Sequence, residues 1–125
     1  MKRVVKTGLP DIGRPMEWAT MGGGLLCTAA VPIRADGSFE TGDAHTQITL
    51  ALSNIEKIVT AAGGQLTDVL QIMVYLTSAD HIPVLNDLWA ETFTPPYPNR
   101  AVMIVTAIGV PDIVIMMQVL AHIDS

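Results

Sequence analysis

The chain has 125 residues, of which half are apolar and 15% are charged, with a formal net charge of −5. This length suits one domain with one hydrophobic core, so residues 1–125 are interpreted as a single domain. Proteins that bind nucleic acids normally present a basic face. Here the only cation after Lys57 is Arg100. The composition therefore argues against a nucleic-acid partner, and against a nuclease.

No targeting or membrane signal stands out. The first ten residues lack the apolar core of a secretory signal. The longest apolar run, Ile113–Met117, is too short to cross a bilayer. The single cysteine, Cys27, excludes an internal disulfide, and its apolar surroundings predict a buried, inert thiol. We expect a cytoplasmic protein with no membrane association.

The first half of the chain predicts short strands and then a helix. Lys2–Lys6 is the first expected strand, and Glu17–Met21 and Leu25–Val31 form a hairpin across three glycines. Asp43 is a plausible N-cap for the helix. Gly63-Gly64 ends the helix, since glycine favours the C-terminal cap. Four residues form its apolar stripe at helical spacing: Ile48, Leu52, Ile55 and Val59.

The second half alternates strand and helix. Asp68–Thr77 reads as a strand with two largely apolar faces, one of them carrying Leu70 with Ile72. A second helix is expected from Asp80 to Phe93, followed by a rigid proline-rich loop that carries Arg100. The last two expected strands are Ala101–Ala107 and Ile113–His122.

This order predicts one sheet with helices packed on one face, an α+β arrangement. The last strand is apolar on both faces except at Gln118. One helical layer covers only one face of a sheet. We therefore expect the other face to meet further copies of the chain, which predicts a homo-oligomer.

Several segments together resemble the Rid (RidA/YjgF) family over about nine-tenths of the chain. Ala62–Thr77 is similar to the family segment "a-G-x-x-x-x-D-V-x-x-x-x-V-y-L-t", and Val84–Phe93 to "v-N-x-x-y-x-x-x-F". Pro98-Asn-Arg100 matches "P-x-R", and Pro10-Asp-Ile-Gly13 resembles "P-x-I-G". Each motif is weak alone, but their order along the chain is specific.

The resemblance implies a chorismate-mutase-like fold, with one mixed sheet and two helices on one face. It also implies a homotrimer whose sheets form a central barrel, with small-molecule clefts between subunits. The best-known members hydrolyse reactive enamines and imines, formed from amino acids, to 2-keto acids and ammonia. We therefore expect a small carboxylate substrate or ligand.

Arg100 is the first candidate site residue, since it matches the family arginine that grips a substrate carboxylate. A guanidinium presents a planar fork that can hold a carboxylate through two hydrogen bonds. A surface arginine is the alternative interpretation.

The catalytic half of the implied site departs from the family. Active deaminases carry a glutamate in the last strand, in a "V-E-I-E-A" setting, where this chain has Met116, and Gln118 stands at the second acidic position. A thioether cannot move protons, and an amide can only hold a water molecule. The usual deaminase mechanism is therefore not expected.

Other residues enter through the resemblance. Glu17 lies in the cleft-forming segment and can move a proton, although a carboxylate at a strand edge is the simpler interpretation. Tyr97 lines the cleft or packs on the surface, and Asn86 matches a family asparagine with either a cleft or a structural role. The family's "S-G-Q" run becomes Thr28-Ala29-Ala30, which predicts a more apolar pocket.

No cofactor or metal is expected, because the three histidines are far apart and lack partners at ligand spacing. Two functions remain open. One is a deaminase or hydrolase of an enamine- or imine-like carboxylate with a non-standard catalytic group. The other is a non-catalytic ligand-binding or regulatory trimer that retains the arginine.

Overall fold

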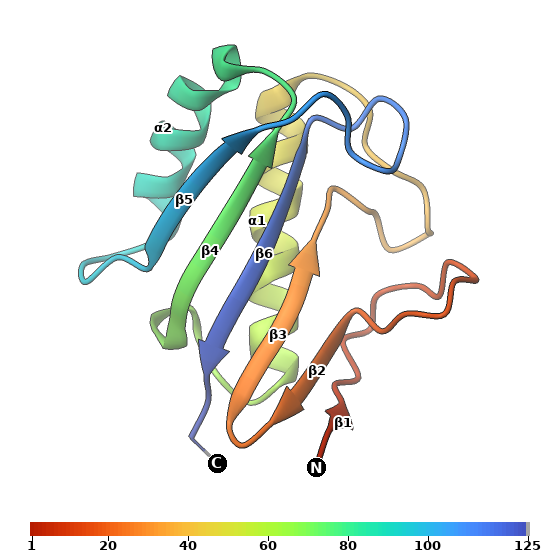
Figure 1. Ribbon diagram of the computed structural model, residues 1–125, viewed down its shortest axis with the longest axis vertical. Helices are drawn as coiled ribbons and strands as arrows, with labels where there is room; N and C mark the ends of the chain where they lie inside the picture. Colours follow the sequence, from red (N-terminus) through yellow and green to blue (C-terminus); the bar gives the residue numbers. More distant parts are fainter. Residues whose placement is uncertain (125) are drawn as a thin grey trace.

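The computed structural model describes residues 1–124 and has one six-stranded sheet with both helices on one face (Figure 1). Strand order is β1-β2-β3-β6-β4-β5. Strands β4 and β5 are parallel and all other neighbours are antiparallel, so the sheet is mixed, as expected. The strands are β1 (Arg3–Val4), β2 (Ala19–Gly22), β3 (Leu25–Ala30), β4 (Val69–Leu76), β5 (Asn99–Ile104) and β6 (Ile115–His122).

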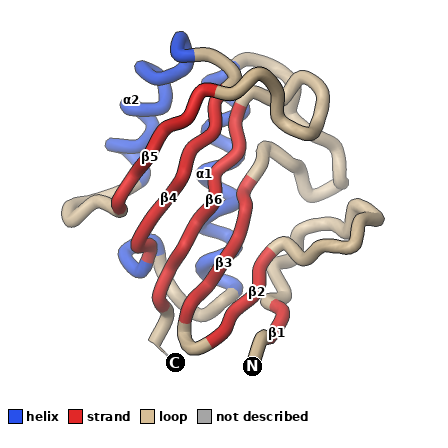
Figure 2. The backbone as a smooth tube through the Cα atoms, in the orientation of Figure 1, coloured by secondary structure: helices blue, strands red, loops and turns tan. Residues whose placement is uncertain are grey.

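Two α-helices, α1 (Ala44–Ala61) and α2 (Ile82–Thr92), form the second layer. Short 3-10 helices, Leu66–Asp68 and Ala79–His81, precede β4 and α2. Figure 2 shows both helices behind the strands, with α1 behind the central strands and α2 nearer β5. No helix in residues 1–124 is long and apolar enough to cross a membrane.

Helix α1 begins and ends where its sequence predicts. The Asp43 carboxylate accepts a hydrogen bond from the backbone N–H of Thr46 at 2.8 Å. That bond lowers the pKa of Asp43, because it stabilises the charged form. Gly63 follows the helix with φ of +92°, a conformation that glycine adopts without strain. All four members of the predicted stripe are buried: Ile48, Leu52, Ile55 and Val59.

Strand β6 alternates between the two faces of the sheet. Ile115, Met117, Val119 and Ala121 are buried under the helices. Their neighbours point to the other side, which we call the open face; on β6 it carries Met116, Gln118, Leu120 and His122. Within one chain this open face has no covering layer (Figure 1).

The alternation in β4 differs from the sequence prediction at its start. The pairing of β4 with β6 is irregular between Val69 and Gln71, which marks a β-bulge. A bulge adds one residue to a strand and reverses the alternation beyond it. Val69 is therefore buried with Ile72, whereas Leu70 is 51% exposed. The prediction that Leu70 shares a face with Ile72 is wrong.

Within one chain, the prediction of a buried Cys27 is also wrong. Cys27 is exposed and lies on the open face. In β3 the side chains directed at the helices belong to Leu26, Thr28 and Ala30. Period-two alternation therefore places Cys27 opposite to the core. The apolar run around it did not reveal which face it takes.

A buried glutamine ties α1 to the loop before β6. The Gln47 amide nitrogen donates to the carbonyls of Gly42 and Asp112, and its oxygen accepts from the backbone N–H of Val114. Replacing Gln47 with Ala is expected to lower the free energy of unfolding by about 2–4 kcal/mol, because buried backbone groups lose their partners. Urea denaturation measures this. Thr49→Ala, an exposed change in the same helix, is the control and should cost little; equal effects would contradict the prediction.

Candidate functional site: an arginine held by helix α2

Arg100 lies inside strand β5, not in the loop where the sequence placed it. Parallel pairing with β4 reaches back to Asn99, and places Arg100 opposite Ile72. The side-chain amide of Gln71 donates to that of Asn99 at 2.8 Å, which fastens the start of the strand. Because Ile72 is buried under the helices, Arg100 emerges on the same face, next to α2.

Helix α2 supplies two contacts to the Arg100 guanidinium. Its Nη2 donates to Oδ1 of Asn86 at 2.8 Å. Its Cζ lies 5.0 Å from the ring centroid of Trp89. Asn86 and Trp89 are three residues apart, which puts them on one side of the helix. The Trp89 contact was not anticipated, because its spacing with Leu85 and Leu88 indicates only a core position.

A depression of about 330 Å³ adjoins this arginine. Such a volume falls at the lower end of typical small-molecule sites. Tyr97, which the sequence proposes as a cleft residue, lines it and is 53% exposed. The structure thus brings together three of the predicted site residues. The lining is Asn86, Trp89, Ala90, Tyr97, Pro98 and Arg100.

Met116 and Gln118 lie elsewhere, on the open face. Met116 is opposite Tyr75 in the pairing of β6 with β4. The Tyr75 hydroxyl donates to Oε1 of Gln118, so the amide oxygen of Gln118 already has a partner. Ala29, another predicted site residue, is opposite Gln118 on β3. Neither Met116 nor Gln118 can transfer a proton.

Thr28, on β3, and Glu17, just before β2, lie toward the edge of the sheet opposite to Arg100. Thr28 is 8% exposed and its hydroxyl donates to the carbonyl of Trp18 at 2.6 Å, which secures the residue before β2. Glu17 is exposed just ahead of it. Strands β3, β6 and β4 separate β2 from β5. At about 4.8 Å per strand, the four steps from β2 to β5 place the axes of these two strands roughly 19 Å apart in one chain.

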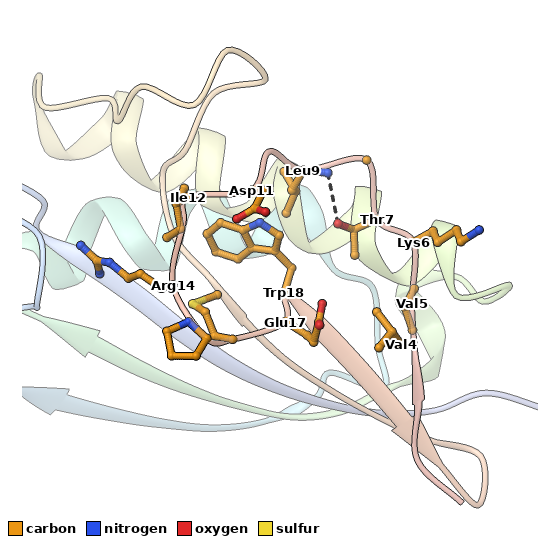
Figure 3. Close-up of a pocket in the computed structure, with 13 residues that line it drawn as sticks. Val4, Val5, Lys6, Thr7, Leu9, Asp11, Ile12, Arg14, Glu17 and Trp18 are labelled. Atoms are coloured by element: carbon orange, nitrogen blue, oxygen red, sulfur yellow. Dashed lines mark hydrogen bonds between the residues drawn. The ribbon is translucent and has the colours of Figure 1, made fainter.

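The segment around Glu17 forms a cavity of its own, of about 410 Å³. Figure 3 shows the Trp18 ring in its middle, with Asp11 beside the ring and the charged ends of Lys6 and Arg14 directed away from it. The Trp18 indole donates to the carbonyl of Pro10 at 2.8 Å, which closes this loop. The carboxylate of Glu17 is near this cavity, at the opposite edge of the sheet from the arginine.

Within residues 1–124, no three His, Cys, Asp or Glu side chains gather where they could hold a metal ion. Of the three histidines, His122 lies on the open face with Nδ1 3.4 Å from Oδ1 of Asp124. The guanidinium of Arg100 has the donor geometry that a carboxylate requires, and the carboxylate of Glu17 is a group that can exchange protons.

Comparison with known proteins agrees with the resemblance. The family model described as endoribonuclease L-PSP matches residues 16–123. A RutC family protein of Pyrococcus horikoshii is 31% identical over 125 residues, covering 98% of each chain. A 2-iminobutanoate/2-iminopropanoate deaminase of Dermatophagoides farinae is 23% identical, covering 80% of each. Among solved structures, E. coli TdcF with bound serine superposes with a TM-score of 0.85 at 21% identity, covering 98% of this chain and 99% of that one.

Proposed function

Because the chain belongs to the Rid family, for which the endoribonuclease L-PSP model matches residues 16–123, we propose that it acts on a small enamine- or imine-like carboxylate. The site is a cleft between copies in a cytoplasmic homotrimer. Arg100 of one copy binds the carboxylate, and Glu17 of the next copy transfers protons. The observation that carries this proposal is the Arg100 guanidinium, held by Asn86 beside a depression of ligand size.

The reaction is hydrolysis of a C=N bond. An enamine first tautomerises to the imine, and water then adds to the imine carbon. The tetrahedral product expels ammonia and leaves the C=O of a 2-keto acid. Glu17 would take a proton from the water and return one to the departing nitrogen, the two tasks of a general acid–base. Asn86, Tyr97, Thr28, Ala29, Met116 and Gln118 remain the predicted contacts around the ligand.

The proposed shared site needs a neighbouring copy, because one chain keeps Glu17 and Arg100 toward opposite edges of its sheet. The family resemblance implies that the copies form a trimer. The open face, with Met116, Leu120 and the exposed Cys27, supplies the apolar surface for the barrel. Light scattering is expected to give about 40 kDa, three times the 13.4 kDa chain, as for cyclic symmetry. A stable monomer at micromolar concentration would rule out the shared site.

Mixing two inactive variants tests the proposal directly. Glu17→Gln and Arg100→Ala are each expected to abolish 2-keto acid formation from imines that an amino acid oxidase generates in situ. Co-refolded at equal amounts, they should recover about a quarter of the parent rate, because each mixed trimer regains one intact cleft. Recovery near zero would mean that both residues act within one copy. A Glu17→Gln variant as active as the parent would mean that Glu17 has no role.

Met116 favours a second candidate function, a ligand-binding trimer without catalysis. A thioether in the position of the family glutamate removes the usual proton donor. If carboxylates bind through Arg100 while no imine in the panel is hydrolysed faster than in buffer, this second function holds. Turnover that depends on Glu17 would reject it.

A further inference from the structure

Arg100 lies on an edge strand, where a long side chain ordinarily samples many rotamers. In this fold its guanidinium lies over the Trp89 ring, with Cζ 5.0 Å from the centroid. An arginine over an indole is attracted by the negative face of the ring. The contact therefore restricts the guanidinium before any ligand arrives.

The Trp89 ring is itself fixed. Trp89 is only 6% exposed. The ring of Phe93 packs against it, with centroids 4.7 Å apart and planes tilted by 46°. Phe93 is 4% exposed and belongs to the hydrophobic core. Trp89 thus connects the hydrophobic core to the guanidinium of Arg100. A rigid support holds a binding group more accurately than a mobile one.

We propose that Trp89 is a positioning residue for Arg100, working with Asn86. The guanidinium lies over the Trp89 ring, and Asn86 accepts a single N–H from Nη2. The remaining N–H groups lie in the plane of the guanidinium, where a carboxylate binds through two hydrogen bonds. Carboxylate binding rests on the proposed function, whereas the stacking of Arg100 on Trp89 does not.

Two substitutions at Trp89 distinguish the effect of its aromatic ring from the effect of its volume. Trp89→Phe keeps an aromatic face under Arg100, whereas Trp89→Leu removes it. Affinity for L-serine, used as a carboxylate probe in calorimetry, is expected to fall about three- to tenfold in Trp89→Leu. In Trp89→Phe the loss should be clearly smaller. Retention of affinity by the phenylalanine at position 89 is not expected if residue 89 only fills space.

A measurement without ligand tests the stacking itself. In the NMR spectrum of the ligand-free protein, the Arg100 Nε–H signal is identified by its disappearance in Arg100→Ala. We expect this signal to be displaced by the ring current of Trp89. Trp89→Leu should return it toward the position of an exposed arginine, and Trp89→Phe should retain part of the displacement.

Leu88→Ala is the matched control, because Leu88 is 8% exposed on the same helix and belongs to the same core. It should lower the melting temperature while leaving the Arg100 signal and the L-serine affinity near those of the parent. An Arg100 signal unmoved in Trp89→Leu, or moved equally in Leu88→Ala, overturns the positioning role. If Arg100→Ala instead binds L-serine as tightly as the parent, the proposed carboxylate site fails, and the stacking is judged on the signal alone.

The two tryptophans of the chain permit an optical readout. In a Trp18→Phe background, Trp89 is the only indole, so its emission should change when L-serine binds at Arg100. The same titration with Arg100→Ala corrects for nonspecific quenching. The opposite result is that calorimetry shows binding through Arg100 while the emission stays constant. That result would contradict a contact between Trp89 and Arg100 in the ligand-bound protein.

Discussion

Hydrolysis of 2-aminoacrylate is expected to be about 10²–10⁴-fold slower than in a Rid relative that carries a glutamate at the position of Met116, since a positioned acid–base group contributes that much. Met116 lies opposite Tyr75 on the open face. Gln118, which stands at the second acidic position of the family segment on β6, accepts a hydrogen bond from the Tyr75 hydroxyl. Neither side chain can exchange protons with a bound imine.

The measurement generates 2-aminoacrylate from serine with a dehydratase and follows the acceleration of pyruvate formation. Met116→Glu introduces the missing group, and Met116→Gln is the matched control, similar in size and shape but unable to transfer a proton. Any gain should appear only with the glutamate. The gain in activity depends on hydrogen-bond partners for the new carboxylate, because an unpaired buried charge is costly. Tyr75, which lies opposite position 116 on β4, is the first candidate partner.

A parent rate equal to that of the glutamate-bearing relative would contradict this expectation. Glu17 would then be the first residue to examine, because its carboxylate is the proton-transfer group proposed for the shared cleft. Loss of that activity in Glu17→Gln would assign the proton transfer to Glu17. Retention of activity would show that the alignment of the last strand with the family is wrong.

Replacing Arg100 with Ala is expected to weaken the binding of pyruvate more than tenfold, a loss of about 1.5–3 kcal/mol for a charge-assisted pair of hydrogen bonds. Asn86 would keep its place on α2 but lose its donor. Calorimetric titration measures the affinity. The melting temperature should change little, because Arg100 is exposed on an edge strand and lies outside the core.

Two further variants sharpen this result. Arg100→Lys keeps the charge but loses the planar fork, so intermediate affinity is expected. Lys57→Ala instead removes an exposed cation from α1, outside the proposed site. This variant is the control for general charge effects, and its loss of affinity for pyruvate should be small. Pyruvate binding as tight in Arg100→Ala as in the parent would show that the carboxylate site lies elsewhere.

Local patterns in the sequence predicted helix α1 closely. Asp43, the buried stripe and Gly63 act through neighbours within a few residues, so capping and periodicity report them directly. The same reasoning failed at Leu70 and Cys27. A bulge in β4 and the choice of face in β3 depend on the partner strand, and a largely apolar run does not specify either.

The sequence by itself predicted the capped helix α1, the alternating strands and the Rid-family segments, and by that resemblance it places Met116 where a glutamate is implied. Only the tertiary structure decided that Arg100, Asn86 and Trp89 converge, and that Glu17 lies at the opposite edge of the sheet. The physical reason is the strand order. Parallel pairing of β5 with β4 brings Arg100 to α2, and contacts between distant segments follow from such pairing rather than from local propensity.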